Sequence, residues 1–208
     1  MKVISPSFVI ESPVDAAKIL KRIEAAGRVC YKSESKITAD SAEEFVRRIV
    51  RSGHESVLEH ASITVRIICD RGVTHEWVRH RIASYSQEST RYCNYTQDRF
   101  GNELTFIKPC FWEEDSPAYA IWVQAMENIE TAYFELLRQG ETAQMARSIL
   151  PNSLKTEMLV TMNLRAWRNF FKLRTASAAH PQMRELTVPL LEQLKGILPV
   201  VFGDLETD

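Results

Sequence analysis

Apolar side chains recur along the chain with two periods, and these periods predict where helices and strands lie. Recurrence every three to four residues is typical of an amphipathic helix, whereas strict alternation is typical of a half-buried strand. Helices are predicted over residues 12–26, 41–52, 117–139, 142–150, 163–173 and from residue 181 onward. Strands are predicted over residues 63–67, where apolar and polar residues alternate, and over residues 158–162.

Turn and cap residues set the expected ends of several elements. The Ser12–Pro13 pair opens the first helix and Gly27 stops it, while Ser41 and Glu44 have the spacing of a capping box for the second. Pro189 predicts a kink in the last helix.

A short helix is expected after the first strand, because apolar residues from Val73 to Ile82 recur at helical spacing. Residues 79–81 would then lie near the C-terminal end of this helix. Residues 84–99 would follow as a polar loop that carries aromatic side chains.

The order of these elements predicts an α+β fold. We expect a single domain over residues 1–208, with a small, mainly antiparallel sheet flanked by several helices and with a helix-rich C-terminal half. No repeat, low-complexity tract or linker interrupts the sequence.

The composition is that of an ordinary globular protein: 208 residues, 45% hydrophobic and 25% charged, are enough for a substantial core. No run of about twenty apolar residues and no basic, apolar leader occurs, so we expect neither membrane insertion nor secretion, and a cytoplasmic location. Four widely separated cysteines without a C-x-x-C pair fit a reducing compartment. The net charge of -1 gives no bulk attraction to nucleic acid, so affinity for phosphate must come from local clusters.

Every basic residue between Lys36 and Lys108 is an arginine. These are Arg47, Arg48, Arg51, Arg66, Arg71, Arg79, Arg81, Arg91 and Arg99. Arginine presents a planar, permanently charged fork that binds phosphate or carboxylate and stacks on flat rings. The first three fit surface ion pairs on the outer face of a helix, whereas Arg79, Arg81 and Arg91 are candidates for ligand binding.

The segment H-E-W-V-R-H, from His75 to His80, begins like a zinc-protease helix and does not complete the pattern. A zinc site of that type needs two histidines four residues apart, on one face of a helix. Here they are five apart, and Arg79 would place a cation beside the metal, so no metal site is expected.

The polar loop after this segment combines arginine, serine, glutamine and tyrosine. Such a loop is costly to order without a partner, and loops on a rigid scaffold commonly carry binding groups. Guanidinium forks, hydroxyls and aromatic faces together suit a ligand that is both phosphorylated and flat, such as a nucleotide or a flavin.

Residues 79–92 resemble the signature of the flavin-dependent thymidylate synthases: R-H-R at residues 79–81, seven further residues, then Ser89, followed by R-Y at residues 91–92. Three other segments resemble the same family in the same order. They are the G-H-E-S turn at residues 53–56, the A-R-S-I-L-P segment at residues 146–151, and the C-terminal group Asn163, Arg165, Asn169, Leu173 and Arg174. The resemblance therefore spans residues 53–174.

The resemblance implies the reductive methylation of dUMP to dTMP in dTMP biosynthesis. Methylenetetrahydrofolate would donate the carbon, and FAD reduced by NADPH would donate the hydride, without a cysteine nucleophile. It also implies a homotetramer whose subunits share active sites, with dUMP, folate and NADPH as small-molecule partners. Because the cofactors carry the difficult steps, the protein mainly supplies binding, orientation and charge.

The resemblance further implies roles for individual residues. Those implied for FAD are Ser56, Arg79, His80, Arg81, Asn163, Arg165 and Asn169, with His54 as a neighbour of the flavin. Those implied for dUMP are Glu76, Arg79, Gln87, Glu88, Ser89, Thr90, Arg91, Arg147 and Arg174. The last of these, Arg174, is also implied as the catalytic group that activates the uracil ring.

The sequence departs from the family pattern in two places: Glu76 stands where many relatives have glutamine, and residues 87–88 are Gln-Glu where many have Glu-Leu or Gln-Leu. The contacts to uracil at these positions stay open. Simpler roles also stay open, namely a turn hydroxyl for Ser56, a helix cap for Asn163 and a surface amide for Asn169.

Two other functions compete with this assignment. One is a non-enzymatic module that stacks RNA bases on the arginine- and tyrosine-bearing loop, against which the near-neutral net charge counts. The other is a different flavoprotein on the same scaffold. Cys93 follows the signature serine without a paired base in the motif, so we expect it to be inert.

Overall fold

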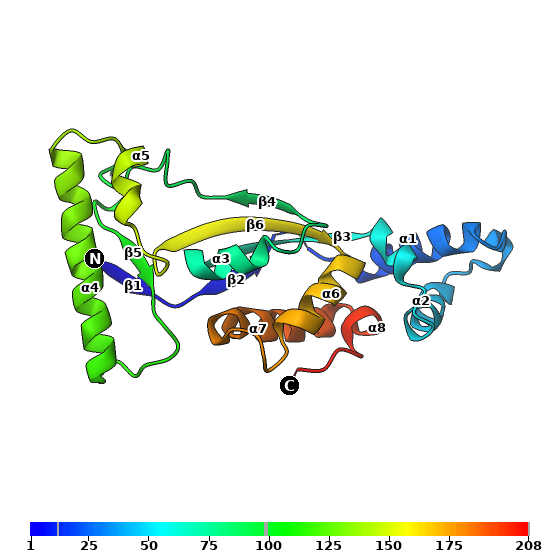
Figure 1. Cartoon of the computed structure of the whole chain (residues 1–208). Helices are drawn as coiled ribbons and strands as arrows, with labels where there is room; N and C mark the ends of the chain where they lie inside the picture. Colours follow the sequence, from blue (N-terminus) through cyan, green and yellow to red (C-terminus); the bar gives the residue numbers. More distant parts are fainter. Residues whose placement is uncertain (12, 98–99, 208) are drawn as a thin grey trace. The chain divides into compact units, whose positions relative to one another are not determined.

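The structure is a computed structural model that describes residues 1–11, 13–97 and 100–207 (Figure 1). Ser12, which was expected to open the first helix, and Arg99 lie outside the described residues. The chain divides into two compact units. Unit 1 comprises Met1–Ser7, Ile67–Arg79 and Ser86–Leu159, and unit 2 comprises Phe8–Arg66, His80–Tyr85 and Val160–Asp208. The expectation of a single domain over residues 1–208 stays a prediction.

Helices and strands are mixed along the chain, which confirms the predicted fold class. The strands are β1 (Lys2–Ile4), β2 (Ser7–Ile10), β3 (Ser62–Asp70), β4 (Ser84–Gln87), β5 (Thr105–Ile107) and β6 (Lys155–Asn163). The α-helices are α1 (Ala16–Val29), α2 (Ser41–Arg51), α3 (Arg71–Trp77), α4 (Pro117–Arg138), α5 (Ala143–Ala146), α6 (Leu164–Arg174), α7 (Pro181–Ile197) and α8 (Pro199–Phe202). Short 3-10 helices are η1 (Glu34–Lys36), η2 (Glu55–His60) and η4 (Arg147–Ile149).

A four-stranded antiparallel sheet has the strand order β2-β3-β6-β4, and three of its strands, β3, β4 and β6, contribute residues to both units. Buried residues alternate with half-buried ones along β3 and β6, as the alternating pattern requires. The hydroxyls of Thr64 and Thr161 join these two strands through a 2.8 Å hydrogen bond. Both predicted strands are confirmed, and each extends beyond its predicted ends.

Unit 1 is built on a second sheet, in which β1 and β5 pair in parallel (Figure 1). In this pairing Val3 lies opposite Phe106. Apolar residues of this sheet and of the long helix α4 form one core, which includes Leu104, Phe106, Trp122, Met126 and Tyr133. Glu130 of α4 fixes the helix to the sheet, because its carboxylate accepts from the Leu104 amide at 2.7 Å and pairs with the N-terminal ammonium at 2.9 Å.

Unit 2 has an aromatic core on helices α6 and α8. Trp167 stacks on Phe171 with ring centroids 5.4 Å apart, and Phe171 meets Phe202 edge-on at 5.9 Å. The indole N–H of Trp167 donates to the Ile63 carbonyl of β3 at 3.1 Å, so the polar edge of this buried ring is satisfied. The helix α6 is thus held rigidly against β3 within unit 2.

The first helix differs from its predicted bounds. It begins at Ala16, because Asp15 caps it by accepting from the Lys18 amide at 2.9 Å, and it continues to Val29. Gly27 does not end the helix. A Cβ at this position would lie 2.6 Å from Cζ of Phe45, so the glycine allows α1 and α2 to approach closely.

The predicted capping box of the second helix is wrong. Ser41 is the first residue inside α2, and its hydroxyl makes no cap bond with the helix. The hydroxyl instead accepts from the Thr38 amide and donates to Glu24 of α1, each at 2.9 Å. The serine therefore connects α2 to the preceding loop and to α1.

The helix predicted over residues 73–82 is too long. It ends at Trp77, and Ile82 is 75% exposed. The strand β4 then begins at Ser84, where a polar loop was expected, because its side chains alternate and it pairs with β6. His80 consequently shares no helix with His75.

The last predicted helix is α7, and Pro189 lies inside it. A further short helix, α8, follows it. In the described part of the chain, no helix is both long and apolar enough to cross a membrane.

Candidate active site

The signature residues that follow β4 form a tight turn ordered by its own backbone, within unit 1. The Ser89 carbonyl accepts from the amides of Tyr92 and Cys93 at 3.1 and 2.9 Å. The Ser89 hydroxyl accepts from the Arg91 amide at 3.4 Å, and Thr90 is buried inside the turn. The turn therefore holds the signature serine and arginine in a defined arrangement.

Gln87, the last residue of β4, has a fixed side-chain amide. Its Nε2 donates to the hydroxyls of Thr74 in α3 and Thr156 in β6, at 3.0 and 3.2 Å. Glu76 lies half-buried in α3, and its carbonyl accepts from the Arg79 amide at 3.2 Å. These contacts tie the end of α3 to the start of the signature turn.

Glu88 uses both carboxylate oxygens inside unit 1. Tyr95 donates to Oε1 at 3.0 Å, and Nζ of Lys155 lies 2.8 Å from Oε2. Burial, and then the Glu88 carboxylate, raise the pKa of Tyr95, so its hydroxyl stays protonated and donates. The three side chains line a cavity of about 360 Å³ whose wall also includes Lys2 and Phe100.

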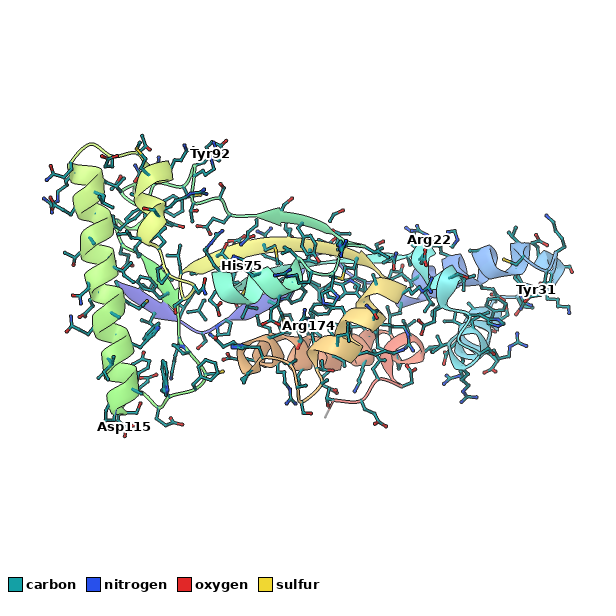
Figure 2. The ribbon with its side chains drawn as sticks, viewed as in Figure 1. Arg22, Tyr31, His75, Tyr92, Asp115 and Arg174 are labelled. Carbon is teal, nitrogen blue, oxygen red and sulfur yellow. The ribbon has the colours of Figure 1, made fainter. Side chains whose placement is uncertain are left out.

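Arg91 contacts a residue that the sequence did not single out. Its Nε donates to Oε1 of Gln144 in α5 at 2.9 Å, and its guanidinium lies 5.3 Å from the centre of the Tyr92 ring. Figure 2 shows Tyr92 beside α5, and this ring is 74% exposed. Because Gln144 is neutral, the charge of Arg91 is not compensated by this contact.

Three other candidate arginines have exposed, uncompensated charges. Arg79 and Arg147 belong to unit 1 and Arg81 to unit 2. Within residues 1–11, 13–97 and 100–207, their guanidinium groups form no ion pair and no side-chain hydrogen bond. By contrast, Arg47 on α2 pairs with Glu43 at 2.7 Å, as expected for a surface helix. Unpaired guanidinium forks of this kind suit phosphate or carboxylate ligands.

His80 and Arg174 are in direct contact within unit 2. Nε of Arg174, the last residue of α6, lies 3.0 Å from Nε2 of His80. Arginine can only donate, so Nε2 of His80 carries a lone pair and the ring is neutral with its proton on Nδ1. The His80 ring also meets Phe170 edge-on at 4.8 Å, and its backbone carbonyl accepts from the Tyr85 hydroxyl at 2.7 Å.

The surroundings of His80 keep it neutral. Burial and the Arg174 charge both lower the pKa of His80 below its ordinary value of 6.5. Burial also raises the pKa of Tyr85 to about 12, so this hydroxyl remains a donor to His80. The signature histidine is therefore an acceptor that holds the guanidinium of Arg174.

The other candidates on α6 have different partners. Asn163 caps the helix by accepting from the Ala166 amide at 2.8 Å, which confirms the simpler role. Arg165 is exposed and pairs with Glu59 of η2 at 2.6 Å. Asn169, one turn further along α6, is exposed. The helix thus presents an arginine and an amide on one outer face.

The G-H-E-S turn leads into η2. His54 precedes the first residue of η2, and both His54 and Ser56 are exposed, whereas Glu55 between them is half-buried and pairs with the buried Arg168 of α6. Arg168 is a second residue that sequence reasoning missed, since a helix position of this kind is ordinarily a surface site. Only its position four residues after Leu164, on the buried side of the helix, distinguishes it in the sequence.

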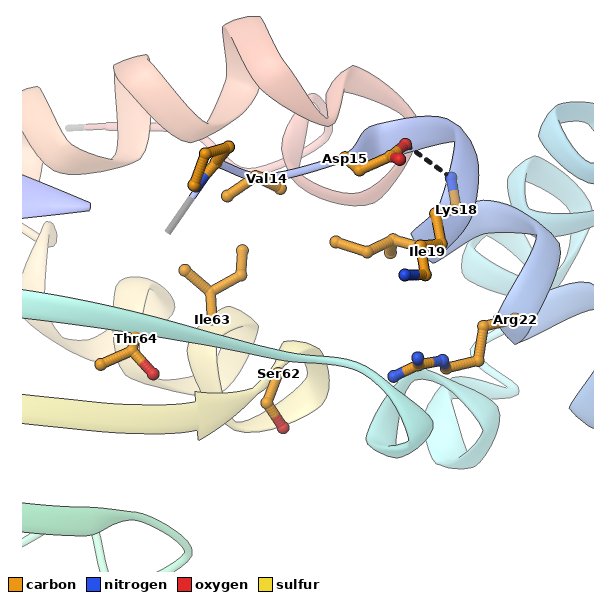
Figure 3. Close-up of a pocket in the computed structure, with 9 residues that line it drawn as sticks. Val14, Asp15, Lys18, Ile19, Arg22, Ser62, Ile63 and Thr64 are labelled. Carbon is orange, nitrogen blue, oxygen red and sulfur yellow. Dashed lines mark hydrogen bonds between the residues drawn. The ribbon is translucent and has the colours of Figure 1, made fainter. Parts of the chain in front are cut away.

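A second hollow of about 300 Å³ lies in unit 2, between the start of α1 and the start of β3 (Figure 3). Figure 3 shows Lys18 and Arg22 of α1 on one side and Ser62 and Thr64 of β3 on the other. The residues that the sequence predicts for the site are not among those that line this hollow.

The candidates fall into two groups that follow the division of the chain. Unit 1 holds Glu76, Arg79, Gln87, Glu88, Ser89, Thr90, Arg91 and Arg147. Unit 2 holds His54, Ser56, His80, Arg81, Asn163, Arg165, Asn169 and Arg174. The residues of unit 1 are those implied for dUMP, and Arg79 among them is also implied for FAD. The residues of unit 2 are those implied for FAD, except Arg174, which is implied for dUMP.

Comparison with known proteins gives matches along nearly the whole chain. Residues 14–200 match a protein family described as thymidylate synthase complementing protein. A flavin-dependent thymidylate synthase of Mycolicibacterium gilvum is 36% identical over 95% of this chain and 84% of its own length. The enzyme of the same name from Mycobacteroides abscessus is 37% identical over 88% of this chain and 78% of its own length.

Solved structures show the same fold. A UMP/dUMP methylase, PolB from Streptomyces cacaoi, crystallised with 5-Br dUMP, superposes with a TM-score of 0.78 at 22% identity, covering 98% of this chain and 96% of that chain. The same protein with 5-Br UMP gives a TM-score of 0.76 at 20% identity. The architecture is thus shared at low sequence identity.

Proposed function

The chain belongs to the family of flavin-dependent thymidylate synthases, and from this premise we propose that it methylates dUMP to dTMP. Methylenetetrahydrofolate donates the carbon, and FAD reduced by NADPH donates the hydride. The observation that carries the proposal is the contact between His80 of the signature and Arg174 of the C-terminal motif, 3.0 Å apart in unit 2. Two family segments that are remote in sequence meet there.

The unit 2 candidates fit FAD by charge and by donor type. FAD offers a pyrophosphate anion and a flat ring with carbonyl and nitrogen acceptors. Arg81 has an uncompensated, exposed guanidinium, and Ser56, Arg165 and Asn169 are exposed donors. We assign these residues to FAD, together with His54 and Arg79. Asn163 contributes as the cap that begins α6, with its side-chain oxygen already accepting from the helix.

The unit 1 candidates fit a nucleotide monophosphate. Arg91 and Arg147 supply charges that no carboxylate compensates among the described residues, and Ser89 supplies a hydroxyl. The amide of Gln87 is oriented by two hydroxyls. We assign these residues, with Glu76, Arg79 and Thr90, to dUMP. Because both carboxylate oxygens of Glu88 are engaged by Tyr95 and Lys155, Glu88 acts by fixing the signature turn.

Arg174 activates the uracil ring in this proposal. Carbon five of uracil attacks well only if electron density flows into the ring, and a fixed cation beside a ring carbonyl stabilises the charge that develops. His80 accepts from Nε of Arg174, which fixes the direction of the guanidinium. When bound, reduced FAD supplies the hydride that completes the methyl group.

Cys93 has no chemical role in this mechanism. It is half-buried and packs against the unit 1 core that contains Tyr95 and Tyr133. We also propose that the enzyme acts in the cytoplasm as a homotetramer with shared active sites, in keeping with the family.

One preparation tests the proposal against both competing functions. The absorbance spectrum of the purified protein reports bound flavin, which an RNA-binding module lacks. Oxidation of the reduced flavin by methylenetetrahydrofolate is then followed with and without dUMP. The proposal predicts oxidation that depends on dUMP and yields dTMP, whereas flavin oxidation independent of dUMP indicates a different flavoprotein.

A further inference from the structure

Arg168 of α6 is a cation buried beneath the G-H-E-S turn. Its side chain is 2% exposed and touches two carboxylates and a carbonyl. Nε donates to Oε1 of Glu55 at 2.8 Å, and the two terminal nitrogens form a fork with Asp204 at 2.5 and 2.7 Å. Nη1 also donates to the carbonyl of Val201 in α8.

These partners keep the buried arginine charged. Burial by itself lowers the pKa of Arg168, but the hydrogen bonds that it donates to Asp204 and Glu55 raise this pKa above its ordinary value. In turn, the bond from Arg168 lowers the pKa of Asp204. A buried guanidinium is tolerated only when it is paired in this way, and removing one partner leaves a charge that is only partly compensated.

The Glu55 contact fixes a turn whose neighbouring residues belong to the candidate site. Glu55 points inward and is half-buried, and its two neighbours, His54 and Ser56, are exposed. Lys172 also approaches the same carboxylate oxygen, but at 4.0 Å and with a side chain 54% exposed. Arg168 is therefore the principal partner that holds this carboxylate.

We propose that Arg168 is a positioning residue for the flavin site. By binding Glu55 through Nε, it fixes the backbone of residues 54–56 against α6, so that His54 and Ser56 project outward toward the ligand. The inference rests on the proposed flavin-binding function. It also accounts for the glutamate of the G-H-E-S turn, which acts through Arg168 instead of touching the cofactor.

The chain offers a matched pair of variants for the test. Glu55 and Asp204 bind the same guanidinium, but one lies in the flavin turn and the other in the C-terminal segment. If Arg168 only stabilises the fold, substitution of either carboxylate should lower the stability of the protein and have the same effect on FAD affinity. If Arg168 positions the flavin site, only the substitution of Glu55 should weaken FAD binding. The full-length proteins carrying Glu55→Gln, Asp204→Asn and Arg168→Lys are therefore compared with the unmodified protein.

Two measurements are made on each protein: FAD affinity by titration of the flavin-free protein, and its thermal unfolding. We expect Glu55→Gln and Arg168→Lys to weaken FAD binding about tenfold and to change the absorbance spectrum of the bound flavin, since about 1.4 kcal/mol corresponds to tenfold. Asp204→Asn should change FAD affinity by less than about twofold while lowering the unfolding temperature by about as much as Glu55→Gln.

Each outcome decides the proposal. Unchanged FAD affinity in Glu55→Gln and Arg168→Lys, with tight binding by the unmodified protein, overturns the positioning role alone. Equal weakening by Asp204→Asn and Glu55→Gln also overturns it, in favour of a general brace. If Glu55→Gln does not fold, Glu55→Asp and Arg168→Lys are judged by the same criterion. An unmodified protein that binds no FAD overturns the proposed function, and the positioning role with it.

Discussion

Nε of Arg174 donates to Nε2 of His80 at 3.0 Å, across 94 positions of sequence. The contact joins the end of α6 to the segment that follows α3, inside unit 2. Burial and the Arg174 charge lower the pKa of His80, so the acceptor nitrogen remains available. The arginine that we propose as the catalytic group is thus oriented by a residue of the flavin signature.

We expect Arg174→Lys to separate flavin chemistry from nucleotide chemistry. Lysine retains the charge but loses the planar fork, and it cannot donate to His80 and to a ring carbonyl in the same arrangement. The variant should retain FAD and oxidise NADPH, while dTMP formation falls about 100-fold or more, as for the loss of a positioned donor to a developing charge.

The competing explanation is that Arg174 only complements the negative end of α6. That effect is worth about 0.3–1 kcal/mol, and lysine would replace it. Flavin content, NADPH oxidation and dTMP formation are measured on the same preparation. Near-normal dTMP formation would falsify the activating role and leave the helix-end explanation.

The His80 contact predicts an acid limit to activity and stability. The folded pKa of His80 lies below the ordinary 6.5 of the unfolded chain, so the unfolded state takes up the proton first as the pH falls. The stability contributed by neutral His80 is complete above about pH 6.5 and is lost as the pH falls toward the folded pKa. Protonation also removes the lone pair that accepts from Arg174.

Activity and thermal unfolding are measured between about pH 5 and pH 8 for the unmodified protein and for His80→Gln. Glutamine retains an acceptor oxygen and does not titrate, so its profile should be flatter on the acid side. If activity and stability fall in the same way at low pH in both proteins, a group other than His80 causes the fall.

Local signals predicted α4 and α6 well. Asn163 caps α6, and Ser116 caps α4 by accepting from the Tyr119 amide at 3.2 Å. A helix cap and a periodic apolar face depend only on residues that are close together in the sequence, so they can be predicted without knowledge of the tertiary structure. The strands β1, β2 and β5 have three or four residues each, too few to show an alternation, and they were not predicted.

Contacts of the candidate site were less predictable. The family resemblance names His80 and Arg174 separately, but only the fold shows that they touch. Gln144 and Arg168 carry no motif of their own, since their roles depend on partners 53 and 113 residues away, respectively. Such pairs are set by tertiary packing, which overrides the local pattern.

Arg79→Ala and Arg81→Ala should each reduce the flavin content of the purified protein. Both guanidiniums lack carboxylate partners in the described part of the chain, so they are available to an anionic cofactor. Each substitution removes a charge-assisted contact worth about 1.5–3 kcal/mol, which corresponds to about 10-fold or more in affinity. Arg51→Ala, at an exposed position at the end of α2, is the control. Full flavin retention by both variants contradicts the assignment.

Ser89→Ala and Cys93→Ala should differ in kind. Ser89→Ala removes a hydroxyl from the signature turn, so dUMP binding should weaken by up to about tenfold while turnover at saturating dUMP persists. Cys93→Ala should leave turnover nearly unchanged, because this thiol packs against the core of unit 1. Steady-state kinetics with varied dUMP distinguish the two effects. An inactive Cys93→Ala protein that binds both FAD and dUMP would show that the cysteine reacts.

The carboxylate of Glu88 holds two neighbouring side chains in unit 1. Its two oxygens bind Tyr95 and Lys155, and the side chains of the ion pair are 12% and 22% exposed, so the pair is shielded from water. Glu88→Gln removes the charge and leaves the ammonium of Lys155 only partly compensated. We expect the free energy of unfolding to fall by about 1–3 kcal/mol.

We also expect Glu88→Gln to weaken dUMP binding by about tenfold, because the signature turn that follows Glu88 loses its anchor. Glu103→Gln is the matched control, since Glu103 lines the same cavity and forms no ion pair within the described residues. Denaturant unfolding and dUMP titration are measured on both variants. If the Glu88→Gln protein is less stable but binds dUMP normally, the contacts of Glu88 stabilise the fold of unit 1 and do not support nucleotide binding.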